Sequence, residues 1–291
     1  MPRLSRHDDG QGNEGGGEED AFMGHCNFHT HTYHCGHAIG APRDYCREAL
    51  AQGISALGFS DHAPWPDGMW SNVRMPLDEL DLYFREIQEA QREFPLLEIH
   101  AGLECEYRPD LGSFTHDAFL ATPGRCEYLV LAIHDYRDPQ GEWHSSWHLH
   151  DTKTYLDYAR YAVLAMESGL FAFLAHPDLF LVARGAWDDN AREAARLIAR
   201  AAQDTHTPLE LNAAGLRRPF VVDDSGLKRR PFPYMGFWEI AAQYDIRAVV
   251  SSDAHDPKDV WGNADETVSM ARYFGIPLAT PESLFPASTP R

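Results

Sequence analysis

The sequence predicts an α/β fold, and the leading architecture is a barrel of seven parallel strands, each followed by a helix. Short apolar runs alternate with longer segments of helical periodicity, which is the pattern of repeated strand–helix units. The chain has 291 residues, and an α/β barrel typically needs about 250 residues. A single barrel therefore accounts for both the alternation and the length.

The expected strands are short and mostly apolar, as is typical of parallel strands buried on both faces. Tyr-Leu-Val-Leu-Ala-Ile at 128–133 is the clearest case. Several of these runs end in a polar or charged residue. The seven runs cover residues 26–31, 56–60, 98–104, 128–133, 171–175, 209–212 and 247–251.

The expected helices follow the strands and carry apolar residues at intervals of three and four. Leu80, Tyr83, Phe84 and Ile87 share one helical face in this way. The helical segments cover residues 42–51, 77–94, 114–120, 155–168, 188–205, 234–244 and 265–273. Residues 277–291 contain four prolines, so we expect an irregular end.

The first 24 residues differ in composition from the rest. They contain six glycines and six acidic residues with almost no apolar side chains, so they cannot bury enough surface to fold. We expect a disordered tail over 1–24 and a single barrel domain over 25–291.

Composition also limits the classes of binding partner and the cellular compartment that we expect. With 25 basic and 44 acidic residues the net charge is −19, which disfavours nucleic acid. Five cysteines without a CxxC pair indicate a reducing cytoplasm rather than a disulfide framework. Apolar runs reach only about six residues, whereas a membrane span needs about 20. We therefore expect a small-molecule partner, with no nucleic acid and no membrane.

Histidine is the anomaly, with 16 in the chain. Many of these histidines, with two carboxylates, fall just past the carboxyl ends of expected strands, where barrel active sites are built. Residues i and i+2 of a strand point to the same side, so two of the pairs can face one site. The candidate metal ligands are His29, His31, His37, His62, Glu104, His134, His176, Asp253 and His255.

Each candidate taken alone has a structural explanation. His134 alone is more often a packed or loop histidine, and Asp253 alone suits a helix N-cap. Nine such residues, at equivalent ends of six expected strands and in the first loop (His37), are harder to explain as independent accidents. Histidine with carboxylate suits Zn, Mn or Fe. Nine ligands divide naturally among three ions, especially if Glu104 bridges two, and clustered divalent ions activate water and clamp phosphoryl oxygens.

Short motifs follow one another along the chain: H-T-H-T (29–32), C-G-H-A (35–38), S-D-H-A-P (60–64), G-L-E (102–104), I-H (133–134), A-H-P-D (175–178) and S-D-A-H (252–255). In this order they resemble the PHP superfamily (polymerase and histidinol phosphatase) over roughly residues 25–275. Within it, C-G-H-A, S-D-H-A-P and L-N-A-A-G-L-R (211–217) resemble most the monofunctional histidinol-phosphate phosphatases.

The resemblance implies a distorted (β/α)7 TIM-like barrel, the PHP fold, with the same nine residues around three metals. It implies hydrolysis of L-histidinol phosphate to L-histidinol and phosphate in histidine biosynthesis, with a metal-bridged hydroxide as nucleophile. Arg217 resembles the family's phosphate-binding arginine, and Arg184 is a second candidate. Asp253 and His255 are the candidates for protonating the leaving group. Asn27 stands where the family commonly has Asp, so we expect it at most to tune the ligands.

Several nearby residues receive weaker expectations. Glu106 and Asp135 are either solvated loop residues, which is favoured, or contacts of the substrate ammonium. His34 is expected to face away from the site, and Cys35 has no assigned role. A second cluster follows a D-P-Q-G loop and is either a surface loop, which is favoured, or a lid beside the substrate. Its histidines are His144, His148 and His150.

Two other functions stay open at this point. One is a PHP phosphoesterase that acts on another small phosphate ester or a nucleotide. The other is a non-catalytic metal-binding module, which the presence of all nine ligand types disfavours.

Overall fold

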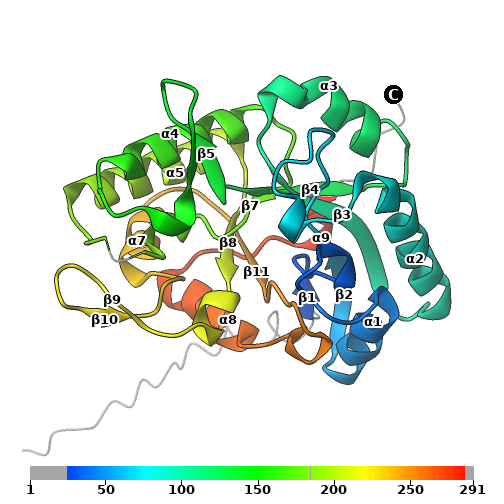
Figure 1. Cartoon of the computed structure of the whole chain (residues 1–291). Coiled ribbons are helices and arrows are strands. Elements are labelled where there is room, and N and C mark those ends of the chain that lie inside the picture. The colour runs from blue at the N-terminus through cyan, green and yellow to red at the C-terminus, as the bar shows by residue number, and fades with distance from the viewer. Residues whose placement is uncertain (1–24, 184, 286–291) are drawn as a thin grey trace, which may run out of the picture.

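The computed structural model describes residues 25–183 and 185–285, and its centre is a seven-stranded parallel sheet curled into a barrel (Figure 1). The strand order β1-β2-β3-β4-β7-β8-β11 follows the sequence, so each expected run supplies one strand. The strands are β1 His25–Asn27, β2 Ile54–Phe59, β3 Glu98–Glu106, β4 Tyr128–Ala132, β7 Phe173–Leu174, β8 Leu209–Asn212 and β11 Ala248–Ser251.

The barrel is nearly closed, because the first and last strands meet just past their carboxyl ends. Thr30 and Ala254 form a parallel bridge, and the His31 N–H donates to the Ala254 carbonyl at 2.9 Å. Below this bridge the Asn27 side-chain amide donates to Ser252 Oγ at 2.8 Å and to the Val260 carbonyl at 2.7 Å. Asn27 thus joins the two edge strands of the barrel.

The helices form a ring outside the strands (Figure 1). Each of the seven expected helical segments overlaps an α-helix, and the first matches residue for residue. Residues 112–120 begin as an α-helix and end in a π-helical turn over His116–Leu120. The α-helices are α1 Pro42–Ala51, α2 Leu80–Glu93, α3 Gly112–Thr115, α4 Thr154–Glu167, α5 Asp189–Thr205, α6 Ala214–Arg217, α7 Met235–Ala241, α8 Ala264–Phe274 and α9 Pro281–Leu284.

One large side chain, Tyr128, crosses the barrel interior. Its hydroxyl donates to the carbonyl oxygens of Phe28 at 2.9 Å and Phe59 at 3.1 Å, which ties β4 to β1 and β2. A Cβ at position 58 would lie 2.2 Å from the Tyr128 hydroxyl, and one at position 102 would lie 2.5 Å from its ring. Gly58 and Gly102 are therefore needed where this ring passes.

Two hairpins decorate the barrel and escaped the sequence-based expectations. The first pairs β5 Asp135–Arg137 with β6 Trp143–Ser145, and the second pairs β9 Val221–Val222 with β10 Lys228–Arg229. The second histidine cluster follows the D-P-Q-G loop, as expected, and this loop is the turn of the first hairpin. His144 itself lies on β6.

The expectation of an irregular end over 277–291 is wrong at residues 281–284, which form α9. Phe285 follows α9 and lies beneath the amino end of the barrel. The Phe285 ring stacks on His100 at 4.3 Å and meets Phe28 edge-on at 5.0 Å. The expected tail, residues 1–24, lies outside the described residues. Within the described ranges, no helix is both long enough and apolar enough to span a bilayer.

Candidate metal centre

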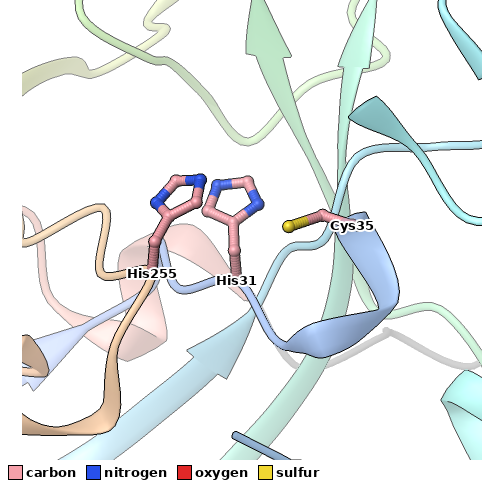
Figure 2. Close-up of side chains that lie close together, drawn as sticks. All are labelled: His31, Cys35 and His255. Carbon is pink, nitrogen blue, oxygen red and sulfur yellow. The ribbon is translucent and has the colours of Figure 1, made fainter. Parts of the chain in front are cut away.

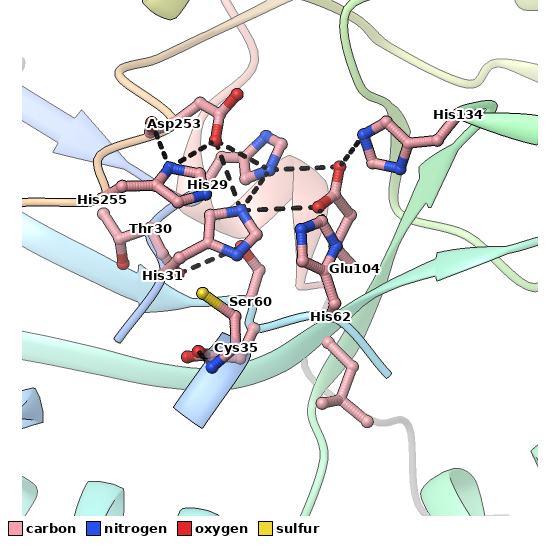
Figure 3. Close-up of polar contacts among 12 residues, drawn as sticks. His29, Thr30, His31, Cys35, Ser60, His62, Glu104, His134, Asp253 and His255 are labelled. Atoms are coloured by element: carbon pink, nitrogen blue, oxygen red, sulfur yellow. Dashed lines mark hydrogen bonds and ion pairs between the residues drawn. The ribbon is translucent and has the colours of Figure 1, made fainter. Parts of the chain in front are cut away.

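The nine predicted ligands converge at the carboxyl end of the barrel, although they come from seven separate places in the chain. Figure 3 shows all of them except His37 and His176, which it does not label. β1 is shorter than expected and ends at Asn27, so His29 and His31 lie in the segment just past it. They still face one side, with their Nε2 atoms 3.1 Å apart.

Glu104, near the end of β3, is the centre of the cluster. Its carboxylate is buried, and five imidazoles lie around it. The distances from its oxygens are 3.3 Å to His29 Nε2, 3.4 Å to His31 Nε2, 2.8 Å to His62 Nδ1, 3.6 Å to His134 Nε2 and 3.2 Å to His176 Nε2.

The remaining ligands extend the cluster toward solvent on the β11 side. Asp253 Oδ1 lies 3.3 Å from His31 Nε2. His255, two residues on, places its Nε2 atom 3.0 Å from the Nε2 atom of His37 in the first loop. The cluster therefore runs continuously from His134 through Glu104 to His37.

Other polar groups hold the second nitrogen of these rings and so fix their orientation. Glu210, in the middle of β8, accepts from His29 Nδ1 at 2.7 Å and from the backbone N–H of His176 at 2.8 Å. Glu106 lies 3.0 Å from His134 Nδ1 and forms an ion pair with Arg74. Sequence reasoning missed Glu210 and Arg74, although a glutamate inside an apolar strand such as L-E-L-N is a usable signal.

The favoured expectation for Glu106 is wrong. It is the last residue of β3 and only 1% exposed, so it is not a solvated loop residue. Burial raises its pKa, but Arg74 and His134 outweigh that effect and lower the pKa to about 2. Asp135, the first residue of β5, is partly buried, and burial and the nearby Glu106 raise its pKa to about 6.

Two of the predicted ligands adopt left-handed backbone conformations. His176 has φ +29° and Asp253 has φ +48°, values that side chains with a Cβ rarely adopt. Such strain persists where the surroundings hold a residue in place, and it concentrates at functional sites.

The donor atoms fit divalent cations. His62 Nδ1 and Glu104 Oε2 lie 2.8 Å apart, yet neither has a hydrogen-bond partner among the described residues. Two buried lone pairs so close together suit a shared cation. Four sets of donor atoms in the described ranges each lie within 4.8 Å of one another: His29–His31–Glu104, His62–Glu104–His134, His37–His62–His255 and His31–Cys35–His255.

The pKa values of several ligand candidates also fit cation binding, because metal ligands must be deprotonated. Burial lowers the pKa of His31 and His37, and it lowers that of His62 to about 4. Burial opposes ionisation of Glu104, but the histidines around it hold its pKa well below the usual range.

The pKa values of His29 and His134 shift in the opposite direction. Burial lowers their pKa, but the carboxylates beside them raise it above the ordinary value. A cation at Nε2 would take the place of the proton on these two rings, because Nδ1 of each already faces a carboxylate.

The other residues of the first loop differ in their relation to the cluster. Figure 2 shows the Cys35 thiol directed toward His31, with His255 beyond. His34 is buried, lies 3.2 Å from Glu86 through Nε2 and 3.7 Å from Glu79 through Nδ1, and belongs to none of the four donor sets in the described ranges.

Comparison with known proteins assigns the family. The PHP domain model matches residues 27–214, more than half of the chain. The chain belongs to the PHP family. A probable histidinol-phosphatase of Deinococcus radiodurans is 32% identical over 275 residues, covering 87% of this chain and 95% of the relative. The histidinol-phosphatase of Bacillus subtilis is 25% identical and covers 80% of this chain and 94% of its own length.

A solved PHP structure supports the fold. The histidinol phosphate phosphatase of Lactococcus lactis, complexed with zinc, L-histidinol and phosphate, superposes with a TM-score of 0.66 at 18% identity. The match covers 89% of this chain and 97% of that structure. The predicted distorted (β/α)7 barrel is thereby confirmed.

Of the two arginines expected from the PHP resemblance to bind phosphate, only Arg217 lies within the described residues, and its guanidinium binds backbone carbonyls. The Arg217 guanidinium donates to the carbonyl oxygens of Ser252 and Gly262, and more weakly to that of Asp253 at 3.4 Å. Its described contacts thus bind the loop that carries Asp253. Arg184 lies outside the described residues.

None of the histidines of the second cluster belongs to a donor set found in the described ranges. His144 lies 2.8 Å from Asp138 and packs on Tyr136, both in its own hairpin. Its neighbour Trp147, however, lies parallel to His134 with ring centroids 6.0 Å apart. This loop therefore borders the PHP site through a tryptophan.

Proposed function

We propose that this protein is a metal-dependent phosphomonoesterase that hydrolyses L-histidinol phosphate to L-histidinol and phosphate, a reaction of histidine biosynthesis. The observation that carries the proposal is the convergence of five imidazoles on the buried Glu104 carboxylate. The name of the Deinococcus relative and the ligands of the Lactococcus structure support this substrate. The cysteine usage keeps the cytoplasm as the expected compartment.

We propose three divalent cations, each Zn, Mn or Fe, on the basis of the ligand types. One would lie at His29, His31 and Glu104 with Asp253 beside them. A second would lie at Glu104, His134 and His176, and a third at His37 and His255, and His62, with one lone pair, would serve one of these two. Cations so held lower the pKa of bound water and offset phosphoryl charge.

The chain's own residues then have separate tasks. Glu210 and Glu106 fix which nitrogen of His29 and His134 faces the cluster. Either of the two proton donors considered can act only if it is not fully committed to a cation. Burial opposes ionisation of Asp253, but the adjacent histidines hold its pKa well below the usual range, so it keeps no proton to give. His255 is more exposed than Asp253, and it can donate a proton only when its Nε2 atom is not bound to the third cation.

Substrate preference tests the proposal. The purified protein is loaded with Mn or Zn, and kcat/KM is compared between histidinol phosphate and a panel of nucleoside monophosphates and other small phosphate esters. We expect a preference of more than about tenfold for histidinol phosphate, equivalent to about 1.4 kcal/mol in the transition state. A smaller preference would assign the site to another phosphate ester. No turnover of any ester would favour a non-catalytic metal-binding module.

A further inference from the structure

One set of donor atoms in the described ranges is not used by the three proposed cations. It combines the Cys35 thiol with the imidazoles of His31 and His255, and its three donor atoms lie within 4.8 Å of one another. Figure 2 shows the thiol directed toward the Nδ1 side of the His31 ring. Cys35 and His31 are both fully buried. We call these three residues the thiol site.

His31 has one ring nitrogen without a partner, and it is the one on the side of the thiol. The Nε2 atom of His31 faces the metal centre, 3.3 Å from Asp253 Oδ1 and 3.4 Å from Glu104 Oε2. The Nδ1 atom is buried and has no hydrogen-bond partner among the described residues. A buried polar atom without a partner is costly, so it marks a place where a ligand is expected.

The neighbouring histidines are engaged at the same atom. Nδ1 of His37 lies 3.0 Å from the carbonyl oxygen of Cys35. Nδ1 of His255 lies 3.1 Å from the carbonyl oxygen of Asp253. Both atoms thus face oxygen, whereas Nδ1 of His31 faces sulfur. Thiolate with imidazole suits a soft cation such as zinc, while Mn prefers carboxylate and other oxygen ligands.

The backbone of the first loop fixes Cys35 in this position. Asp61, just past β2, accepts from the backbone N–H groups of Thr32 at 2.9 Å and of Cys35 at 3.1 Å. Gly36 follows in the left-handed conformation, with φ +78°. The Cys35 carbonyl then meets His37, as described above. Cys35 is therefore anchored through its backbone on both sides, and its side chain is left to face the histidines.

We propose that the thiol site binds a thiophilic divalent cation, zinc in excess or cadmium, and that this cation inhibits the enzyme. Its ligands are Cys35 Sγ and His31 Nδ1, with His255 as the third. Binding releases the thiol proton to solvent, because the thiolate is the form that binds metal. The site thus distinguishes cations by their affinity for sulfur.

The thiol site and the proposed catalytic cations exclude one another, because they share ligands. A neutral imidazole has one lone pair. When His31 binds through Nδ1, its proton lies on Nε2, where the Asp253 and Glu104 carboxylates are the acceptors at hand. His31 is then lost to the first cation.

His255 is shared in the same way. Its Nε2 atom lies 3.0 Å from that of His37, where the third cation is proposed, and it can serve only one of the two sites. A cation at the thiol site therefore removes one ligand from each of two catalytic cations. The inhibition rests on the proposed phosphatase function, whereas binding at the thiol site does not.

Cadmium tests the site directly, because cadmium bound to thiolate gives a charge-transfer absorbance in the ultraviolet. The full-length protein is loaded with Mn and titrated with cadmium chloride. We expect the wild type to exceed Cys35→Ser by the absorbance of one thiolate-bound cadmium per chain, and excess Mn to weaken this binding. The other cysteines are common to both proteins, so the difference reports Cys35 alone.

Cys46→Ser is the matched control. Cys46, on α1, is also fully buried, but it belongs to no donor set in the described ranges. This variant should absorb as the wild type does.

Inhibition of histidinol phosphate hydrolysis gives the second readout. In Cys35→Ser the cadmium concentration for half inhibition should rise by more than about tenfold, the smallest effect expected even for a group that only supports a ligand. The kcat of the Mn-loaded variant without cadmium should be close to that of the wild type, and Tm checks its fold. Cys35→Ala repeats both measurements without a hydroxyl group in the buried position.

Three results would overturn the inference: no absorbance that depends on Cys35, an equal loss of absorbance in Cys46→Ser, or cadmium inhibition that is the same in the wild type and in both Cys35 variants. Failure of the proposed function looks different. In that case the Cys35-dependent absorbance is present, but no metal-loaded form hydrolyses histidinol phosphate.

Discussion

The two ends of the barrel each carry histidines and carboxylates, and they use them in opposite ways. At the amino end His100, near the start of β3, lies 2.8 Å from Glu127 through Nδ1 and 2.9 Å from Glu98 through Nε2. Both ring nitrogens are thus engaged, and Phe285 covers the ring. This histidine has nothing left to offer a ligand.

At the carboxyl end of the same strand the rings are held from one side only. Glu210 and Glu106 engage Nδ1 of His29 and His134, and Nε2 of each ring faces Glu104. The residue types are the same as around His100. The difference shows that coordination capacity depends on which nitrogen remains open, and not on the number of histidines.

Removing the central carboxylate should have the largest effect. Glu104→Gln deletes the negative charge around which five imidazoles gather. We expect kcat/KM to fall by more than about a hundredfold, because losing a group that only supports a ligand already costs about 10- to 100-fold. Metal content by mass spectrometry should fall as well. Glu98→Gln, at the amino end of the same strand, is the control and should retain metal and activity.

Changing histidines one at a time should separate the two histidine clusters. His134→Ala removes a ring 3.6 Å from Glu104 and should lower bound metal. His148→Ala, in the exposed loop after β6, should leave metal content unchanged. If His148→Ala strips metal from the protein, the choice between the two clusters is wrong.

Loosening the support of a ligand should have a smaller effect. Glu210→Gln retains the shape of the side chain but weakens its hold on His29 Nδ1 and on the His176 backbone. Metal affinity should fall by about 10- to 100-fold without loss of the fold. Competition with a chelator measures the affinity, and circular dichroism checks the fold. Unchanged affinity would mean that Glu210 does not orient the ligand.

The smallest effect is expected at the amino end, and it concerns stability alone. Burial lowers the pKa of His100, but Glu127 and Glu98 outweigh it, so the folded-state pKa is raised. The stabilisation that Glu127 and Glu98 give to protonated His100 is therefore fully present below the unfolded-state histidine pKa of about 6.5. It is lost as pH rises through the pKa of His100 in the folded protein.

His100→Gln tests this dependence. It should lower the free energy of unfolding by about 1 kcal/mol at pH 5.5 and by less at pH 8.5, after screening is allowed for. Urea unfolding at the two pH values measures the difference. A larger loss at pH 8.5 would contradict the sign.

The sequence was sufficient for the parts of this molecule that depend on local pattern. The helix Pro42–Ala51 begins at a proline and was predicted residue for residue. His134 and His176 were located because each directly follows a short apolar run, and parallel strands bring such positions to one end of a barrel. Conversely, β1 ends earlier than its apolar pattern indicated, and past its end Thr30 forms only an isolated bridge to Ala254, beyond β11.

Contacts between segments that lie far apart in the chain could not be predicted from local sequence patterns. Glu106 seemed a loop residue because nothing in the sequence indicates that Arg74, 32 positions earlier, folds against it. Likewise the sequence does not distinguish Arg217 from Arg218. Only the folded structure shows that the Arg217 guanidinium binds backbone carbonyls, whereas the Arg218 guanidinium packs on Trp147. The short strands of the β5–β6 hairpin carry too few residues to show a period.

The central claim is that the carboxyl end of the barrel, and not its amino end or the His144 loop, is a multi-metal centre built on Glu104. Anomalous-difference maps, recorded from crystals of the metal-loaded protein at the absorption edge of the bound metal, test it most directly. We predict peaks within coordination distance of Glu104 and of the His37–His255 pair, and none beside His100 or His144. Peaks confined to those other histidines, or no peak at Glu104, would contradict the account.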